Sequence, residues 1–161
     1  SAVVLPMDGY HLPQARLVEL GRRDRMGAPD TFDVDGFLAT LSALRAVDNS
    51  GNPVLAPGFD RGIEEPVPDA IRILQELSTV VVEGNYLLLE SGGWERVAPL
   101  LDATVFVRVD RGVRLDRLIE RHERFGKSPA DARAWALGPD ERNAQLIEAT
   151  ATRADRVIEL P

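Results

Sequence analysis

The sequence predicts an α/β fold built on a parallel sheet. Short apolar runs rich in valine alternate along the chain with segments whose apolar residues recur at helical spacing. The apolar runs are largely continuous instead of alternating with polar residues, which is typical of strands that are buried on both faces. The 161 residues contain no internal repeat, low-complexity stretch or linker, so we expect a single domain over residues 1–161.

The first half of the chain opens on a strand and contains one clear helix. Residues 2–5 form a short apolar strand, and residues 7–11 follow it as a loop. Apolar residues at helical spacing predict a helix over 34–47, which Asp33 or Asp35 caps. The other expected segments are a turn at 49–53, an extended stretch at 54–60, a loop at 62–68, a strand or short helix at 70–77, and a buried strand at 79–82.

The second half alternates between helices and strands in the same way. The expected elements, in order, are a helix at 94–101, a strand at 103–109, a long arginine-rich helix at 113–125, helices at 129–137 and 139–152, and a last strand at 156–160. Strands and helices in this alternation favour parallel pairing of the strands.

Composition excludes several classes of function. The chain has no cysteine, which rules out disulfides, thiolate zinc sites and cysteine nucleophiles. No apolar run approaches the ~18 residues of a membrane span, and the N-terminus does not resemble a signal peptide. The net charge of −7 argues against a general surface for nucleic acid or anionic membranes. We therefore expect a cytoplasmic protein whose partners are small molecules.

Acidic residues follow two of the expected strands, near the point where each strand ends. Asp8 comes shortly after the strand at 2–5, and Glu83 directly follows the strand at 79–82. Ligands of parallel sheets bind beyond the carboxyl ends of the strands. An aspartate before glycine is equally typical of a plain turn, whereas a glutamate after an apolar run needs a partner such as a metal-bound water or a substrate hydroxyl. Two such carboxylates suit phosphoryl transfer, in which one positions the nucleophile and the other helps to hold Mg²⁺.

Arginine accounts for all but one of the 19 basic residues, and genome composition is one explanation of that bias. Four arginines have spacings of 3, 4 and 3, which places them on one face of the helix at 113–125. They are Arg114, Arg117, Arg121 and Arg124. Nearby acids could make this a solvated, salt-bridged face, whereas bidentate binding of phosphate by guanidinium groups is the functional alternative.

The single lysine lies in a segment that looks like the end of a phosphate-binding loop. Gly126, Lys127 and Ser128 match the last residues of G-x-x-x-x-G-K-[ST], but Arg121 stands where that pattern needs its first glycine. The preceding segment is a helix as well, so we interpret Gly126 as a helix stop. Neither histidine has metal-ligand spacing, and His11 is the better candidate for contact with a substrate because it follows the first strand.

Six segments in this order resemble the uridine kinase, pantothenate kinase and phosphoribulokinase group of P-loop kinases, and most closely its bacterial nucleoside/nucleotide kinase-like (fructokinase-like) subgroup. The segments are MDGYH (7–11), GAPDTFDVDGF (27–37), PGFDRGIEEPVP (57–68), VVVEGNYLLL (80–89), VRVDRGVRLDRLIERHERFG (107–126) and RADRVIEL (153–160). The resemblance implies a three-layer parallel-sheet P-loop NTPase fold, with a lid helix at about 113–125. It also implies an ATP- and Mg²⁺-dependent kinase that phosphorylates a hydroxyl of a small molecule.

The resemblance assigns roles to particular residues. Asp8 matches the catalytic base, and Glu83 matches the acidic residue that holds Mg²⁺ through water. The lid arginines Arg114, Arg117 and Arg121 match those that bind the ATP phosphates, the last two of them also stabilising the transferring phosphoryl group. The expected substrate contacts are Tyr10, His11, Phe59, Arg61, Asn85 and Tyr86, and the strand near Val157 lies where the family holds adenine.

This sequence departs from the nucleoside kinases on the substrate side. Gly27 and Ala28 stand near the position of the aspartate that contacts the ribose hydroxyls, and Arg61 and Glu64 replace the residues that hold uracil. A small polar acceptor such as a sugar or a hydroxy acid therefore fits better than uridine.

The resemblance also implies elements that these residues do not contain. The family's fold begins with a strand, the P-loop G-x-x-x-x-G-K-[ST] and a helix, and that strand is central, between the strands at 79–82 and 103–109. We therefore expect the fold to lack these elements here, the P-loop lysine to lie before Ser1, and the chain to be inactive as a kinase without them. Two alternatives are a non-catalytic domain that binds a ligand or partner but not ATP, and a homodimer in which a partner chain fills the central position.

Overall fold

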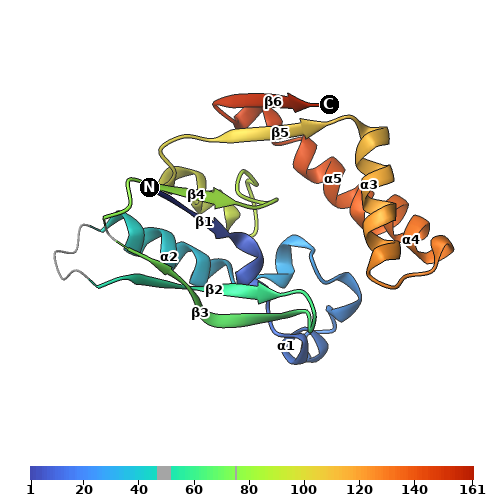
Figure 1. Cartoon of the computed structure of the whole chain (residues 1–161), viewed down its shortest axis with the longest axis horizontal. Helices are drawn as coiled ribbons and strands as arrows, with labels where there is room; N and C mark the ends of the chain where they lie inside the picture. Colours follow the sequence, from blue (N-terminus) through green and yellow to red (C-terminus); the bar gives the residue numbers. More distant parts are fainter. Residues whose placement is uncertain (47–51, 75) are drawn as a thin grey trace. The chain divides into compact units, whose positions relative to one another are not determined.

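The computed structural model describes residues 1–46, 52–74 and 76–161, and these form two compact units (Figure 1). The first unit spans Ser1–Leu101 and the second spans Asp102–Pro161. Strands and helices alternate in both, as the sequence predicted. The single domain expected over residues 1–161 stays a prediction.

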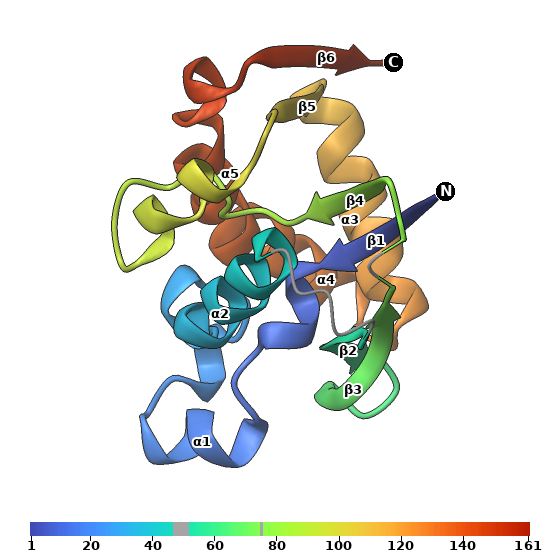
Figure 2. The same ribbon diagram turned by 90° about the vertical axis from the view of Figure 1, so that its left-hand side faces the viewer.

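A pair of parallel strands forms the sheet of the first unit. β1 (Ala2–Pro6) pairs with β4 (Thr79–Glu83) in a register that runs from Ala2 opposite Thr79 to Pro6 opposite Glu83. Figure 2 shows the two strands side by side and running in the same direction. Both strands were predicted, each one residue shorter. Burial on both faces is wrong for this described pair, because Val4 and Val81 are about half exposed, at 54% and 48%.

The helix expected after residue 33 is present as α2 (Val34–Arg45). Asp33 caps it, because its carboxylate accepts a hydrogen bond from the amide of Gly36 at 2.9 Å. The apolar face of α2 is buried in the core of the unit. The predicted last two residues of this helix are not part of it: Ala46 is the extended cap, and Val47, like most of the expected turn at 49–53, lies outside the described residues.

A short helix, α1 (Gln14–Glu19), and an antiparallel hairpin complete this part of the chain. The hairpin joins β2 (Val54–Asp60) to β3 (Glu65–Ile73). The loop expected over 62–68 is therefore wrong from Glu65 onward, and residues 70–73 belong to a strand. The prolines of β3 are tolerated because the strand pairs with β2 alone in the described chain and is therefore an edge strand.

An aromatic cluster fills the core of the first unit. Trp94 and Tyr86 are almost fully buried, and both rings lie 5.8 Å from the ring of Phe32. Their polar atoms are satisfied by backbone carbonyls, because the Trp94 indole donates to Pro29 at 3.0 Å and the Tyr86 hydroxyl donates to Gly27 at 2.5 Å. These bonds fasten the segment around residues 27–32 to the core.

The helix expected at 94–101 is instead two 3₁₀ turns, Trp94–Arg96 and Ala98–Leu100. Pro99 explains the break, since its ring cannot donate the hydrogen bond that a continuous α-helix needs at that position.

The second unit repeats the parallel pairing. β5 (Val105–Val109) pairs with β6 (Arg156–Leu160), with Val105 opposite Arg156 and Val109 opposite Leu160. Both strands were predicted, β5 with two extra residues. Within the described residues, β4 pairs only with β1 and β5 pairs only with β6. Both outer edges of each two-stranded parallel pair therefore have no strand partner among them.

The helix expected as the lid is α3 (Arg111–Arg124), capped by the Asp110 carboxylate at the amide of Gly112. Two residues after its end lies Gly126, whose φ of +95° favours glycine. The Ser128 hydroxyl then caps the next helix. The interpretation of this segment as a helix stop is thus confirmed, and Lys127 lies over the Trp135 ring at 4.8 Å.

Two shorter helices follow, α4 (Pro129–Trp135) and α5 (Glu141–Glu148). A π-helical turn at Ala136–Asp140, which contains a proline, separates them. The helix expected over 139–152 is therefore shorter at both ends. Among the described residues, no helix is long and apolar enough to cross a membrane.

Two glycines allow close approaches around the end of β1. A Cβ on Gly9 would lie 2.1 Å from the carbonyl oxygen of Pro57 in β2, and a Cβ on Gly84 would lie 2.6 Å from the Cβ of Met7. Both glycines flank the carboxylates that the sequence analysis singled out. They therefore fix how the segments after β1 and β4 pack against their neighbours.

We predict that Gly9→Ala destabilises the protein by about 3 kcal/mol, the upper end of the usual cost of overpacking, because a backbone carbonyl cannot yield as a side chain can. Chemical denaturation monitored by circular dichroism measures the effect. Gly138→Ala is the matched control, since its Cβ would meet only the far end of Arg142 at 3.9 Å. Equal stability of the two variants would contradict the described packing of Gly9.

Candidate active site

The register of β1 and β4 brings the two predicted carboxylates to the same edge of the sheet. Pro6 lies opposite Glu83, and the chain after Pro6 turns at once into the 3₁₀ helix Met7–Tyr10, which carries Asp8. The two carboxylates are close enough for the charge of Asp8 to raise the pKa of Glu83. The structure thus brings together the two residues that the sequence placed at strand ends.

Arg61 joins this pair from the tip of the β2–β3 hairpin. Its Nη2 donates to Oδ2 of Asp8 at 2.6 Å. The Arg61 side chain is 64% exposed and that of Asp8 is 30% exposed, so the ion pair lies at the surface of the unit. The sequence analysis placed both residues at the site but did not anticipate their contact.

His11 lies beside the carboxylates between two aromatic rings. Its ring centroid is 4.1 Å from that of Phe32 and 4.7 Å from that of Phe59. Its Nδ1 is 2.7 Å from the carbonyl oxygen of Asp8, and since a carbonyl only accepts, Nδ1 carries the hydrogen. Burial lowers the pKa of His11 despite the opposing effect of that hydrogen bond. A neutral ring leaves Nε2 as an acceptor.

The hairpin tip is held in place by the segment that contains α1. The backbone amide of Gln14 donates to the Glu65 carboxylate at 3.3 Å, and the Gln14 side chain donates to the carbonyl of Ile63 at 2.9 Å. Arg23 pairs with Glu64 at 3.3 Å. These contacts position the turn from which Arg61 extends. They join residues about 50 positions apart, which is why the local sequence gave no sign of them.

A shallow groove with a volume of about 530 Å³ runs along the hairpin beside Arg61. It is lined by Gly58, Phe59, Asp60, Arg61, Val67 and Ala70. Two of these residues, Phe59 and Arg61, are among the substrate contacts that the sequence analysis expected. The groove therefore offers an apolar wall that ends at a guanidinium group.

The Glu83 carboxyl group lies in an environment that disfavours its charge. Glu83 is exposed at the end of β4, yet desolvation of its carboxyl group by the surrounding chain contributes most to raising its pKa. The negative charge of Asp8 adds to this, and the Arg61 guanidinium lowers the pKa in part. No cluster of three or more metal-ligating side chains occurs in the described chain. One or two carboxylates without further protein ligands fit Mg²⁺, which keeps several waters and is otherwise bound by substrate phosphates.

The arginines of the lid helix have different partners. Arg114 and Arg111 both bind the buried Glu141, at 2.5 Å and 2.8 Å, and these hydrogen bonds, led by that of Arg111, lower the pKa of Glu141. Arg124 pairs with Glu120 at 3.0 Å. For these residues the salt-bridged interpretation of the helix face is confirmed.

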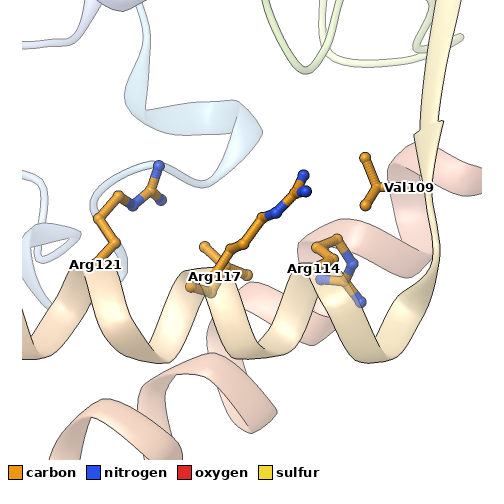
Figure 3. A pocket seen from close by; sticks show the side chains of 5 residues that line it. Val109, Arg114, Arg117 and Arg121 are labelled. Carbon is orange, nitrogen blue, oxygen red and sulfur yellow. The ribbon is translucent and has the colours of Figure 1, made fainter. Parts of the chain in front are cut away.

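The other two lid arginines remain available. Arg117 donates only to the carbonyl of Pro161, at 3.2 Å, and Arg121 has no partner among the described residues. A cavity of about 220 Å³ lies here, lined by Arg114, Arg117 and Arg121 together with Val109 and Leu118. Figure 3 shows the guanidinium groups of Arg117 and Arg121 extending from the same side of α3. Free guanidinium groups around a small cavity suit a phosphate.

The remaining expected substrate contacts divide between the core and the surface. Tyr10 is buried with its hydroxyl donating to Thr40 at 2.7 Å, and Tyr86 is buried in the aromatic cluster. Burial raises the pKa of Tyr10. Asn85 is exposed next to Glu83. The structure gives both tyrosines a packing role, and their contact with a substrate stays a prediction.

Comparison with known sequences identifies relatives along nearly the whole chain, although no family model matches it. The chain is 40% identical over 148 residues to the ATP-dependent kinase-like protein notR' of Aspergillus versicolor, covering 88% of this chain and 86% of that protein. It is 31% identical to YggC of Escherichia coli, covering 97% and 63%, and 26% identical to the ATP-dependent kinase YFH7 of Zygosaccharomyces rouxii, covering 99% and 51%. The chain thus spans about half to two thirds of several relatives.

Solved structures agree with these relatives. A protein assigned as a fructose transport system kinase, from Silicibacter sp. TM1040, matches with a TM-score of 0.86 and 34% identity, over 98% of this chain and 74% of that one. YFH7 of Saccharomyces cerevisiae, solved as a P-loop-containing kinase, shares the fold with a TM-score of 0.83 at 23% identity, over 99% and 57%.

We predict that Glu83→Gln raises the melting temperature at pH 7. The folded state disfavours ionised Glu83, so the native protein binds more protons than the unfolded chain between the ordinary pKa of 4.5 and the raised one. Stability is therefore lost as the pH rises through that window. The gain in melting temperature of Glu83→Gln over the parent should be largest at pH 7 and vanish near pH 4.

Thermal unfolding at several pH values measures this difference. Glu123→Gln, on the exposed face of α3 and with no partner in the described chain, is the matched control and should leave the melting temperature nearly unchanged. A Glu83→Gln variant that is less stable than the parent at pH 7 would show that the carboxylate is favourably paired instead.

Proposed function

The chain belongs to the P-loop kinase family, and from that premise we propose that it transfers the terminal phosphoryl group of ATP to a hydroxyl of a small polar metabolite. The observation that carries this proposal is the placement of Asp8 and Glu83 at one edge of the β1–β4 sheet. Phosphoryl transfer needs positioning and electrostatic stabilisation far more than covalent chemistry, and a pair of carboxylates beyond the strand ends supplies both.

Asp8 acts as the general base in this proposal. Its carboxylate orients the acceptor hydroxyl and takes its proton as the new bond to phosphorus forms. The 3₁₀ turn of residues 7–10 and the close packing of Gly9 against Pro57 hold this carboxylate in place. Glu83 keeps a second carboxylate nearby, which would hold Mg²⁺ through a water molecule. The metal would neutralise charge on the phosphates of ATP.

The lid arginines bind ATP in this proposal. Arg114, Arg117 and Arg121 contact phosphate oxygens, and Arg117 and Arg121 also stabilise the charge of the transferring phosphoryl group. Arg114 is held against Glu141, which leaves Arg117 and Arg121 as the more available pair. A P-loop of pattern G-x-x-x-x-G-K-[ST] does not occur in the 161 residues. The backbone cradle for the β- and γ-phosphates is therefore proposed to lie outside them.

The acceptor side of the proposed site is formed by His11, Phe59, Arg61 and Asn85, which lie at or beside the hairpin groove and the strand ends. The resemblance implies that the residues that hold uridine in the nucleoside kinases are replaced here, so a sugar or hydroxy acid is proposed as the acceptor. We place the reaction in the cytoplasm, with small molecules and not nucleic acid or membranes as partners.

A second candidate function applies to a full-length protein that carries no P-loop. A domain that keeps this fold without a P-loop would bind a ligand or a partner but no ATP. Calorimetry of the full-length protein with ATP and Mg²⁺ separates the two, because a kinase binds ATP and a non-catalytic remnant does not. Absence of ATP binding by the full-length protein would exclude the kinase function.

We predict that Asp8→Asn lowers kcat for an accepted substrate by about 10²- to 10⁴-fold, the usual contribution of a general base. An asparagine keeps the shape of the side chain but cannot accept the proton. A coupled assay of ADP release measures the loss. Asp24→Asn is the matched control, because Asp24 is exposed and has no partner in the described chain. Unchanged turnover in Asp8→Asn would show that the proposed base is wrong.

We predict that Arg121→Gln raises KM for ATP about tenfold, which corresponds to the loss of roughly 1.4 kcal/mol of binding. The unpaired guanidinium of Arg121 is free to bind phosphate, whereas that of Arg124 is engaged by Glu120. Arg124→Gln on the same helix is therefore the control and should leave KM nearly unchanged. Equal effects of the two substitutions would contradict the assignment of Arg121 to ATP.

A further inference from the structure

We propose that the acceptor carries an anionic group, a carboxylate or a phosphate, which Arg61 binds and which thereby frees Asp8 from its ion pair. This inference rests on the proposed kinase function and adds the chemical class of the acceptor. It starts from the contact between Arg61 Nη2 and Asp8 Oδ2, which are 2.6 Å apart.

The ion pair with Arg61 engages one carboxylate oxygen of Asp8, the proposed general base. An oxygen that accepts a short, charge-assisted hydrogen bond from a guanidinium is not free to accept the proton of an incoming hydroxyl. A neutral alcohol competes poorly with a guanidinium for a carboxylate, because it carries no charge. An anionic group on the same molecule changes this balance, since it offers Arg61 an equivalent partner while the hydroxyl approaches Asp8.

Arg61 has the unused donors and the exposure that an exchange of its hydrogen-bond partner requires. A guanidinium has five N–H donors, and in the described chain Arg61 uses one of them, with Asp8. Its side chain is 64% exposed, so solvent and a dissolved ligand can reach it. The backbone beneath it is fixed, because the amide of Gly62 donates to Asp60 at 2.8 Å and Gln14 holds the carbonyl of Ile63. The guanidinium can therefore move while its base stays in place.

Because of the charges around Asp8, binding of an anionic acceptor depends on Arg61. Asp8 and Glu83 are both acids that disfavour a negative group nearby, and burial lowers the pKa of His11. Each of the three acids at the hairpin tip has a partner: Glu64 pairs with Arg23, Glu65 accepts from the amide of Gln14, and Asp60 accepts from the amide of Gly62. Among the described residues that contact these carboxylates, Arg61 is therefore the cation that can offset their repulsion of an anionic ligand.

The groove beside Arg61 offers room for the rest of such a molecule. Phe59, Val67 and Ala70 supply an apolar wall, and the one acid in the lining, Asp60, has its Oδ1 occupied by the amide of Gly62. The volume of about 530 Å³ suits a molecule of the size of a sugar phosphate.

Matched pairs of acceptors test the inference on the full-length protein. The probes are glycerol and glycerate, ribose and ribose 5-phosphate, and fructose and fructose 6-phosphate. ADP release gives kcat/KM for each, and calorimetry without ATP gives the affinity. We expect the anionic member of at least one pair to be preferred by tenfold or more, with glycerate reporting on a carboxylate and the sugar phosphates on a phosphate.

Substitution of Arg61 distinguishes an anion-binding role from a packing role. Arg61→Gln should raise KM for the anionic acceptor about tenfold and bring its preference over the neutral partner close to one, because only the anion loses a contact. Arg61→Lys should restore part of the preference, since it keeps the charge without the planar fork. Arg16→Gln is the control, because Arg16 is exposed on α1 and pairs only with Glu19.

The outcomes separate this inference from the proposed function. Turnover that favours the neutral probes, or a preference that Arg61→Gln leaves unchanged, overturns the anionic acceptor and leaves the kinase function standing. Binding of anionic probes that depends on Arg61 without any ADP release supports the anion site and overturns the kinase function. Neither binding nor turnover with any probe overturns both.

Discussion

The parallel register of β1 and β4 is the constraint on which the proposed site depends. Pairing Pro6 with Glu83 sends both strands toward the same edge, so that two acidic residues separated by 75 positions in sequence come close enough to influence each other. A slip of one residue would turn every side chain of the strand to the opposite face. The glycines after each strand allow this arrangement, because the absence of a Cβ lets Gly9 pack against the backbone of Pro57 and Gly84 pack against the Met7 side chain.

The same arrangement has an electrostatic cost. Two carboxylates at one sheet edge repel each other, which the raised pKa of Glu83 records, and one exposed arginine offsets the repulsion only in part. Natural proteins commonly retain such unfavourable groups where their chemistry requires them. In the second unit the balance is reversed, because Glu141 and Glu120 neutralise part of an arginine-rich helix, while Arg117 and Arg121 line a cavity and form no ion pair among the described residues.

Features with a local cause could be predicted from the sequence. Apolar runs located β1, β4, β5 and β6 to within two residues at each end, and the position of Asp8 and Glu83 after such runs was enough to place them at one edge. In the β2–β3 hairpin, the extended stretch predicted at 54–60 is confirmed as β2, but the first half of β3 was missed, because its prolines are typical of a loop whereas pairing with β2 decides its conformation. The Asp8–Arg61 contact and the burial of Tyr10 and Tyr86 depend on packing between distant segments, which neither spacing nor composition encodes.

The central claim is that Asp8 receives the proton of an acceptor hydroxyl at the end of β1. A crystal structure of the full-length protein with a non-hydrolysable ATP analogue, Mg²⁺ and an accepted substrate tests it most directly. The account predicts the acceptor hydroxyl within hydrogen-bond reach of an Asp8 carboxylate oxygen, about 2.6–3.2 Å, and Arg61 turned from Asp8 to the anionic group of the acceptor. An acceptor bound elsewhere, with the Asp8–Arg61 ion pair intact, would contradict it.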